Sequence, residues 1–115
     1  MSIMKSIVLS VLVLCNFAMA QTKPVWIDVR TTEEYSTNHI DGDANIPLAT
    51  IDTEKLAAQY GKDAEIMLYC RSGNRAGQAK TLLEQAGFTH ITNAGGIDDV
   101  RKLRELAETS SSTGQ

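Results

Sequence analysis

One stretch constrains the fold of this chain more than any other. Four residues, 66–69, predict a short buried strand that runs directly into Cys70. A polar turn follows, and residues 75–86 then carry a helical pattern that ends at Gly87. A short loop between a strand and a helix directs several backbone N–H groups and the helix N-terminus toward one point. The sequence therefore predicts an anion cradle with the thiol of Cys70 at its centre.

The residues after Cys70 indicate a reactive thiol rather than a core cysteine. Two arginines and a glycine stand directly behind it, and such surroundings favour the thiolate, which is the nucleophilic form. We expect the arginines to attract an anionic donor and the loop N–H groups to stabilise charge on the sulfur. The predicted substrate-binding loop consists of Arg71, Ser72, Gly73, Asn74 and Arg75.

Residues 1–20 predict a cleaved signal peptide. Lys5 precedes an apolar run over residues 7–14, and Ala18 and Ala20 give the small-x-small pattern of a signal-peptidase site. The apolar run is shorter than the roughly 20 residues that span a bilayer. We therefore expect export to the periplasm and a mature chain that begins near residue 21, with no stable membrane anchor.

The rest of the sequence predicts one domain over residues 21–108 and a disordered polar tail over residues 109–115. Loss of Lys5 with the leader changes the net charge from −3 to −4, and an acidic chain without a basic run offers no nucleic-acid surface. Cys15 is lost too, so Cys70 remains as a single cysteine, which indicates a reactive thiol or intermolecular pairing. Without paired cysteines or clustered histidines we expect no metal and no cofactor.

Strand and helix patterns alternate along the expected domain. This alternation predicts an α/β fold with a small, mainly parallel sheet and helices on both faces. The expected strands are residues 25–30, 44–47, 66–69 and 89–92, and the expected helices start near residues 32, 53, 75 and 98.

Three segments follow predicted strands at the carboxyl edge of this sheet, where ligands bind in such folds. One contains Cys70, one contains Asp28 and Arg30, and one contains Gly95 and Gly96. We expect Asp28 and Arg30 to support the site structurally, with Arg30 paired to a glutamate of the following helix. The two glycines predict a permissive loop.

Six segments of the sequence resemble the single-domain rhodaneses in residue type, order and spacing. Further similarity in residues 77–80, 89–91 and 93–96 is to the exported phage-shock-type rhodaneses. The resemblance implies the rhodanese α/β fold and a thiosulfate sulfurtransferase, which passes a sulfane sulfur through a cysteine persulfide to cyanide or a thiol. It also implies a small-molecule donor and a thiophilic acceptor, in a monomer or weak dimer. The six segments are residues 26–30, 34–35, 39–42, 45–47, 70–75 and 95–96.

The sequence departs from the family pattern at three positions outside the thiol loop. Asn38 stands where the family usually has glycine, Asp43 makes the same turn more acidic, and Val100 replaces a frequent tryptophan. These departures concern packing and substrate range rather than the chemistry of the thiol.

Two other functions use a similar loop. The first is a persulfide carrier or a binding module for a partner protein, because carriers and enzymes share the same persulfide. The second is a cysteine phosphatase or arsenate reductase, in which the arginine lies one residue further from the cysteine than Arg75 lies from Cys70. The shorter loop of this chain favours a small sulfur centre over a tetrahedral oxyanion.

Overall fold

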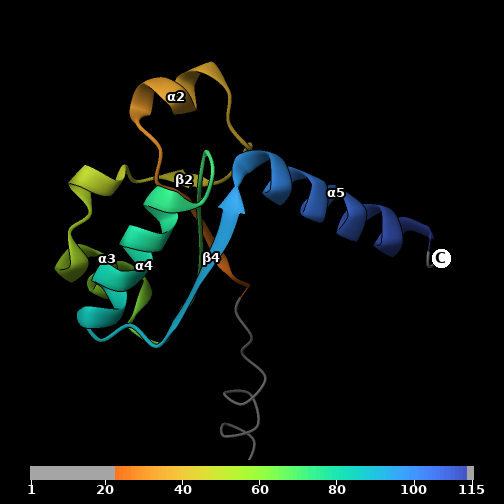
Figure 1. Cartoon of the computed structure of the whole chain (residues 1–115). Helices are drawn as coiled ribbons and strands as arrows, with labels where there is room; N and C mark the ends of the chain where they lie inside the picture. Colours follow the sequence, from red (N-terminus) through yellow and green to blue (C-terminus); the bar gives the residue numbers. More distant parts are fainter. Residues whose placement is uncertain (1–22, 114–115) are drawn as a thin grey trace, which may run out of the picture.

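The computed structural model describes residues 23–113, which form one four-stranded sheet with helices around it (Figure 1). The order of the strands is β2-β1-β3-β4, and each neighbouring pair is parallel. The predicted α/β class with a parallel sheet is confirmed. The predicted signal peptide lies outside the described residues. The strands are β1 (Val25–Asp28), β2 (Ala44–Asn45), β3 (Glu65–Cys70) and β4 (His90–Gly96).

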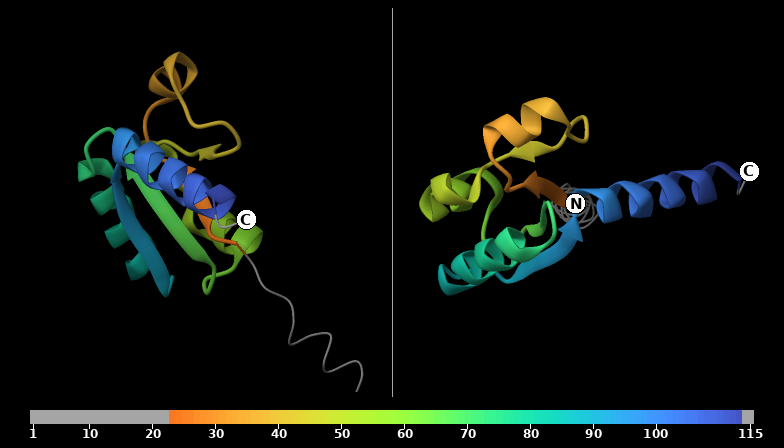
Figure 2. Two further views of the ribbon diagram at one scale, coloured as in Figure 1. Left: turned by 90° about the vertical axis from the view of Figure 1, so that its right-hand side faces the viewer. Right: turned by 45° about the horizontal axis from the view of Figure 1, so that its top comes forward.

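Helices cover both faces of this sheet, as predicted. Helices α3 and α4 pack on one face and α5 packs on the other, while α2 lies beyond the carboxyl ends of the strands (Figures 1 and 2). Within residues 23–113, no helix is both long and apolar enough to span a membrane. The helices are α2 (Thr32–Thr37), the 3-10 turn η2 (Leu48–Thr50), α3 (Thr53–Tyr60), α4 (Asn74–Gln85) and α5 (Ile97–Thr113).

The alternation of side chains along β3 divides the core into two layers. Ile66, Leu68 and Cys70 belong to the larger cluster beneath α3 and α4, where Leu83 of α4 is also fully buried. Tyr69 points to the opposite face and packs with residues of α5. Because β3 lies between β1 and β4 and is buried on both sides, the end of this strand is a rigid position for Cys70.

Two element boundaries differ from the prediction. Strand β4 extends through Gly95 and Gly96, which were expected to form a loop. Helix α5 continues to Thr113, although the sequence predicted a disordered tail from residue 109. Serine and threonine are only mildly unfavourable in helices, and the first strong helix breaker in this region is the glycine at position 114.

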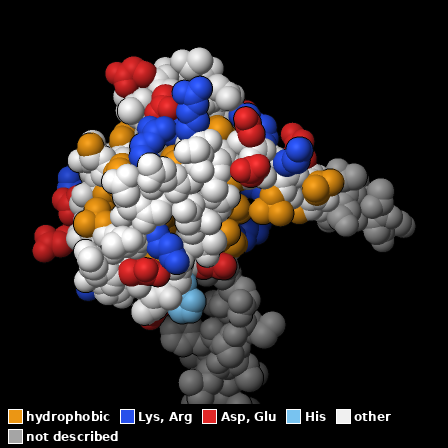
Figure 3. All heavy atoms as spheres, in the orientation of Figure 1, with side chains coloured by type: hydrophobic (Ala, Val, Ile, Leu, Met, Phe, Trp, Pro, Cys, Tyr) orange, Lys and Arg blue, Asp and Glu red, His pale blue; other side chains and the backbone are white. Residues whose placement is uncertain are grey.

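The outer half of α5 projects away from the sheet (Figures 1 and 2). Leu103 is 57% exposed and Leu106 is 65% exposed, and hydrophobic side chains are visible on the projecting helix in Figure 3. Val100, one of the three departures from the family pattern, is fully buried beneath the inner half of the helix. The departure at Val100 is therefore accommodated by close packing.

Candidate active site

The thiol of Cys70 lies at the carboxyl end of β3, under the first turn of α4. Cys70 is 1% exposed, and the backbone N–H of Gly73 donates a hydrogen bond to its Sγ at 3.0 Å. Gly73 is the N-cap of α4 and has a φ of 99°, a left-handed conformation that glycine adopts without strain. The predicted strand–loop–helix with a cysteine at its centre is present.

The loop favours the charged form of this thiol. Burial acts to raise the pKa of Cys70, but four backbone N–H groups around the sulfur lower it by more, so the pKa lies below its ordinary value. These donors were expected between Arg71 and Arg75, but only three of the four lie in that range, and the fourth, Ala76, follows it in α4. The four N–H groups belong to Ala76, Ser72, Gly73 and Arg75.

Strand β4 supports the loop from below. A Cβ atom on Gly96 would collide with the backbone carbonyl oxygen of Arg71, and one on Gly73 would lie 3.3 Å from the Cα of Gly95. The loop and the glycine pair are therefore in backbone-to-backbone contact, which only residues without a side chain allow. The expected supporting role thus has a steric basis at Gly96, while Gly95 offers its Cα to Gly73, and both glycines lie in a strand and not in a loop.

A β-bulge places the glycine pair at this position. Leu68 pairs with Asn93, and Cys70 pairs with Gly96. Between these two pairs β4 contains one residue more than β3, which is a bulge. The φ of Gly95 within this bulge is 94°, a positive value that glycine adopts without strain. The bulge turns the end of β4 toward the thiol loop.

Asn93 is a site residue that the sequence analysis missed. Its Nδ2 donates to the carbonyl oxygen of Gly73 at 2.9 Å, and its Oδ1 accepts from the N–H of Gly95 at 2.9 Å. One side chain thus fixes both the cap of α4 and the bulge. The signal in the sequence is an amide side chain two residues before a glycine pair at a strand end.

The two loop arginines have different surroundings. Arg75 Nη1 donates to Glu34 Oε1 at 2.6 Å and Arg75 Nη2 donates to Glu34 Oε2 at 3.1 Å. Glu34 also accepts from the N–H of Thr31 in the capping box of α2. The Arg75 pair, aided by the Thr31 N–H, lowers the pKa of Glu34 to about 2. Arg75 is therefore held against α2, whereas Arg71 is exposed.

Asp28 and Arg30 form a buried pair behind the loop. Arg30 Nε donates to Asp28 Oδ1 and Oδ2, each at 3.0 Å, and Arg30 Nη2 donates to Asp28 Oδ2 at 2.8 Å. The expectation that Arg30 pairs with a glutamate of α2 was wrong, because Asp28 lies two residues away on the same strand end. Arg30 Nη2 also donates to the carbonyl oxygen of Asn38 at 2.6 Å, which ties the end of α2 to β1. The contacts of the pair are those of a scaffold.

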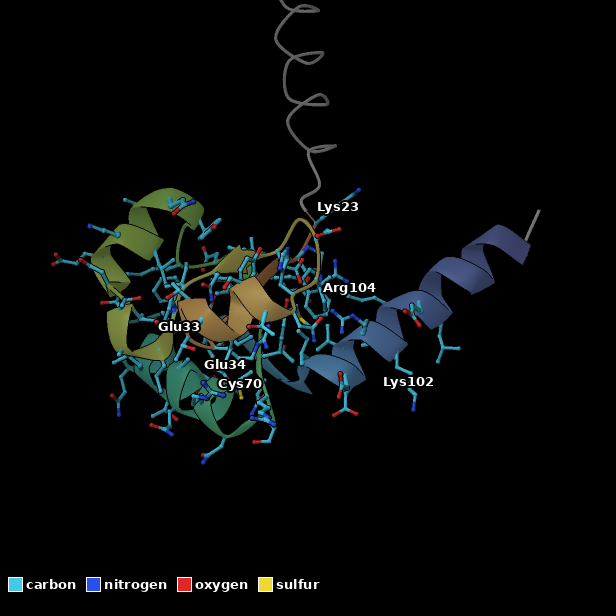
Figure 4. The ribbon with its side chains drawn as sticks, turned by 90° about the horizontal axis from the view of Figure 1, so that it is seen from above. Lys23, Glu33, Glu34, Cys70, Lys102 and Arg104 are labelled. Atoms are coloured by element: carbon cyan, nitrogen blue, oxygen red, sulfur yellow. The ribbon has the colours of Figure 1, made fainter. Side chains whose placement is uncertain are left out.

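A hollow of about 470 Å³ opens beside the loop. Its lining includes Arg71 and side chains from both α2 and α5, and in the view from above Glu33, Glu34 and Cys70 lie on the same part of the molecule (Figure 4). Ser72 and Asn74 are exposed on the loop. The lining residues are Arg30, Glu33, Glu34, Thr37, Asn38, Arg71, Ile97 and Asp98.

Asp43, another departure from the family pattern, has its partners on the opposite face of β3. Its carboxylate is buried and accepts from Tyr69 Oη at 2.5 Å and from Arg104 Nη1 at 2.7 Å. Burial and this bond to Asp43 raise the pKa of Tyr69. Arg104 also lies 4.6 Å above the centre of the Trp26 ring. The extra acid in the turn is thus compensated, and it anchors α5 to the sheet.

No group of His, Cys, Asp or Glu side chains in the described part of the chain could hold a metal ion.

A parallel sheet with a cysteine loop at its carboxyl edge is the architecture of a rhodanese-like domain. Residues 16–103 match the rhodanese-like domain family, and the chain belongs to this family. A solved structure described as a rhodanese with anions from Escherichia coli superposes with a TM-score of 0.61 at 41% identity, covering 67% of this chain and 91% of that chain.

Two relatives show the range of the family. The chain is 41% identical to the thiosulfate sulfurtransferase PspE of Escherichia coli K12 over 75 residues, which are 65% of this chain and 72% of that protein. It is 37% identical to the putative sulfur carrier protein YrkF of Bacillus subtilis over 67 residues, which are 58% of this chain and 35% of that protein.

Proposed function

We propose that this chain is a thiosulfate sulfurtransferase that carries a sulfane sulfur as a persulfide on Cys70. The observation that supports this most strongly is the lowered pKa of a buried thiol among four backbone N–H groups. A buried cysteine without such donors would be less acidic than a free thiol. The similarity to a thiosulfate sulfurtransferase agrees with this proposal.

The proposed reaction has two displacement steps. In the first, the Cys70 thiolate attacks the outer sulfur of thiosulfate, the Sγ–S bond forms, the S–S bond of thiosulfate breaks, and sulfite leaves with the electron pair. In the second, cyanide or a thiolate attacks the terminal sulfur of the persulfide, and Cys70 leaves as a thiolate. Covalent catalysis of this kind predicts ping-pong kinetics.

The loop stabilises the persulfide in the same way as the thiolate. Its N–H groups are fixed before the reaction by the first turn of α4 and by β4, so no reorganisation is needed when charge moves onto the added sulfur. The guanidinium of Arg71 supplies the exposed positive charge that attracts thiosulfate. Arg75 acts mainly through its backbone N–H, because its side chain is paired with Glu34.

A persulfide carrier is the second candidate, and the match to a putative sulfur carrier protein favours it. A carrier would form the same persulfide but would release it to a partner protein instead of turning over with small acceptors. Phosphatase activity is the third candidate, and we expect aryl phosphate hydrolysis at background because of the short loop.

Intact mass measurement tests the proposal. Incubation with thiosulfate should add one sulfur atom to the protein, and Cys70→Ser should add none. Steady-state turnover with thiosulfate and cyanide then separates an enzyme from a carrier. Retention of a substantial fraction of the activity in Cys70→Ser would contradict the covalent mechanism.

We also propose that residues 1–20 direct export and are removed, so that the domain acts in the periplasm without a membrane anchor. In this proposal the partners of the protein are the small-molecule donor and the acceptor, and it does not bind nucleic acid. The protein itself is a monomer or a weak dimer. N-terminal sequencing of the exported protein should begin near residue 21, and a chain that still carries Met1 would contradict the assignment.

A further inference from the structure

The hollow beside the thiol loop contains two carboxylates that a sulfur donor does not need. Glu33 lies in the first turn of α2 and Asp98 lies in the first turn of α5, and both line the hollow. Both are exposed, and neither forms an ion pair within residues 23–107. Thiosulfate is a dianion, so these two groups repel it.

Arg71 is the one cation of the hollow that no carboxylate of the described residues neutralises. Arg30 and Glu34 also line the hollow, but each is held in a pair with a partner described above. The hollow thus presents one unpaired positive charge, on the residue that follows Cys70, and two unpaired negative charges from α2 and α5. A ligand that matches this arrangement carries a positive charge, or charges of both signs.

We infer that the thiol acceptor of this protein is a small aminothiol, whose ammonium group is bound by Glu33 and Asp98. Where the acceptor also has a carboxylate, Arg71 binds it. This inference rests on the proposed function, because it concerns the second half of the sulfur transfer. The volume of about 470 Å³ lies within the range of small-molecule sites and far exceeds what cyanide requires.

The chemical step needs no additional reactant. The thiolate of the aminothiol attacks the terminal sulfur of the Cys70 persulfide, a new S–S bond forms, and the bond from that sulfur to Sγ breaks. Cys70 leaves as the thiolate, which the four N–H groups stabilise. The product is the persulfide of the aminothiol.

The test separates the two halves of the reaction. The protein is loaded with thiosulfate, freed of excess donor, and mixed with cysteamine, 2-mercaptoethanol or 3-mercaptopropionate, which are cationic, neutral and anionic. The rate of sulfur loss from Cys70 is followed by intact mass. Each variant is compared with wild type for the same acceptor, so that the pKa of the acceptor thiol cancels.

The variant Glu33→Gln with Asp98→Asn should discharge to cysteamine about fivefold more slowly, the effect of losing two exposed charge pairs. Discharge to 2-mercaptoethanol should change by less than about twofold, within the spread of neutral surface substitutions. Discharge to 3-mercaptopropionate and loading by thiosulfate should both become faster, because two repelling charges are gone.

Two control variants are matched to these changes. Asp99→Asn removes a carboxylate from the same helical turn as Asp98 but outside the hollow, and Glu65→Gln removes one at the far end of β3. Neither should alter the ratio between acceptors. Equal slowing of cysteamine and 2-mercaptoethanol, or no change with either, would overturn the inference. If wild type gains no sulfur on loading, the proposed function itself fails, which is a separate result.

Discussion

Glu34 and Arg75 join α2 to the thiol loop through two parallel hydrogen bonds, of 2.6 Å and 3.1 Å. The two side chains are 27% and 31% exposed, so the pair is shielded from water over most of its surface. A guanidinium and a carboxylate in this arrangement fix orientation as well as charge. The side chain of Arg75 is therefore not available to bind an anionic sulfur donor.

Replacing Glu34 with Gln should lower the free energy of unfolding by about 1 kcal/mol at pH 7, the upper range for a partly exposed pair. The pKa of Glu34 falls from 4.5 to about 2 on folding, so its contribution is present above pH 4.5 and is lost as the pH falls toward 2. Urea unfolding across this range should show the two proteins converging. Glu33→Gln, in the same helical turn, should change stability little, and an equal loss there would contradict the role of the pair.

The two arginines should give different kinetic results. Arg71→Ala should raise the KM for thiosulfate by about tenfold, at the lower end of the loss of a charge-assisted hydrogen bond, and should leave the free energy of unfolding unchanged. Arg75→Ala should instead lower stability by about 1 kcal/mol, because it breaks the pair with Glu34. Steady-state kinetics and urea unfolding of both variants check this. If both variants changed the KM and the stability by the same amounts, the ion pair with Glu34 would not give Arg75 a different role from Arg71.

Gly96→Ala should disrupt sulfur transfer through a steric effect alone. The new Cβ meets the carbonyl oxygen of Arg71, which is fixed backbone, so the loop has to move. We expect a loss of about 1–3 kcal/mol of stability and a large loss of sulfur loading per folded molecule. Gly42→Ala is the control, since it introduces strain at a φ of 90° with nothing within 4 Å. That variant should lose stability but load sulfur normally.

Asn93→Ala should raise the pKa of Cys70 toward that of an ordinary thiol. Without the amide, the carbonyl oxygen of Gly73 keeps the helical N–H of Gly77 but loses its link to β4, so the N-terminal cap of α4 is less firmly held against the sulfur. The pH dependence of alkylation by iodoacetamide measures this pKa, with the urea-unfolded protein as the reference. Asn93→Asp keeps the acceptor for Gly95 but not the donor for Gly73, so it should show the same upward shift. If Cys70 in Asn93→Asp kept the lowered pKa of the wild type, the effect of Asn93→Ala would come from the lost hydrogen bond to Gly95 in the bulge instead.

Much of the site follows from local sequence patterns. Residues 66–86 contain the strand, the cysteine and the helix one after another. The apolar periodicity and the glycine at position 73 were therefore enough to predict a thiol under a helix N-terminus. A threonine cap at the start of α2 was likewise predictable from residue type, although Thr31 and Thr32 were equally suitable and the structure uses Thr31.

Contacts between distant segments were not predictable in this way. Glu34 and Arg75 are 41 positions apart, and several acids and bases of the chain could have formed that pair equally well. The extension of β4 depends on a one-residue shift of register against β3, which the glycine pair permits but does not by itself specify. The partner of a surface charge and the position of a bulge are decided by the packed sheet.

The contact between the thiol loop and β4 has a consequence for the order of assembly. Gly73 and Asn93 are 20 positions apart, and the backing of the loop comes from the last strand of the sheet to be synthesised. A chain in which β4 has not yet docked holds Cys70 in an unsupported loop, with the modest reactivity of a free cysteine. The lowered pKa of Cys70 is therefore a property of the completed sheet and not of the strand, loop and helix of residues 65–85 alone.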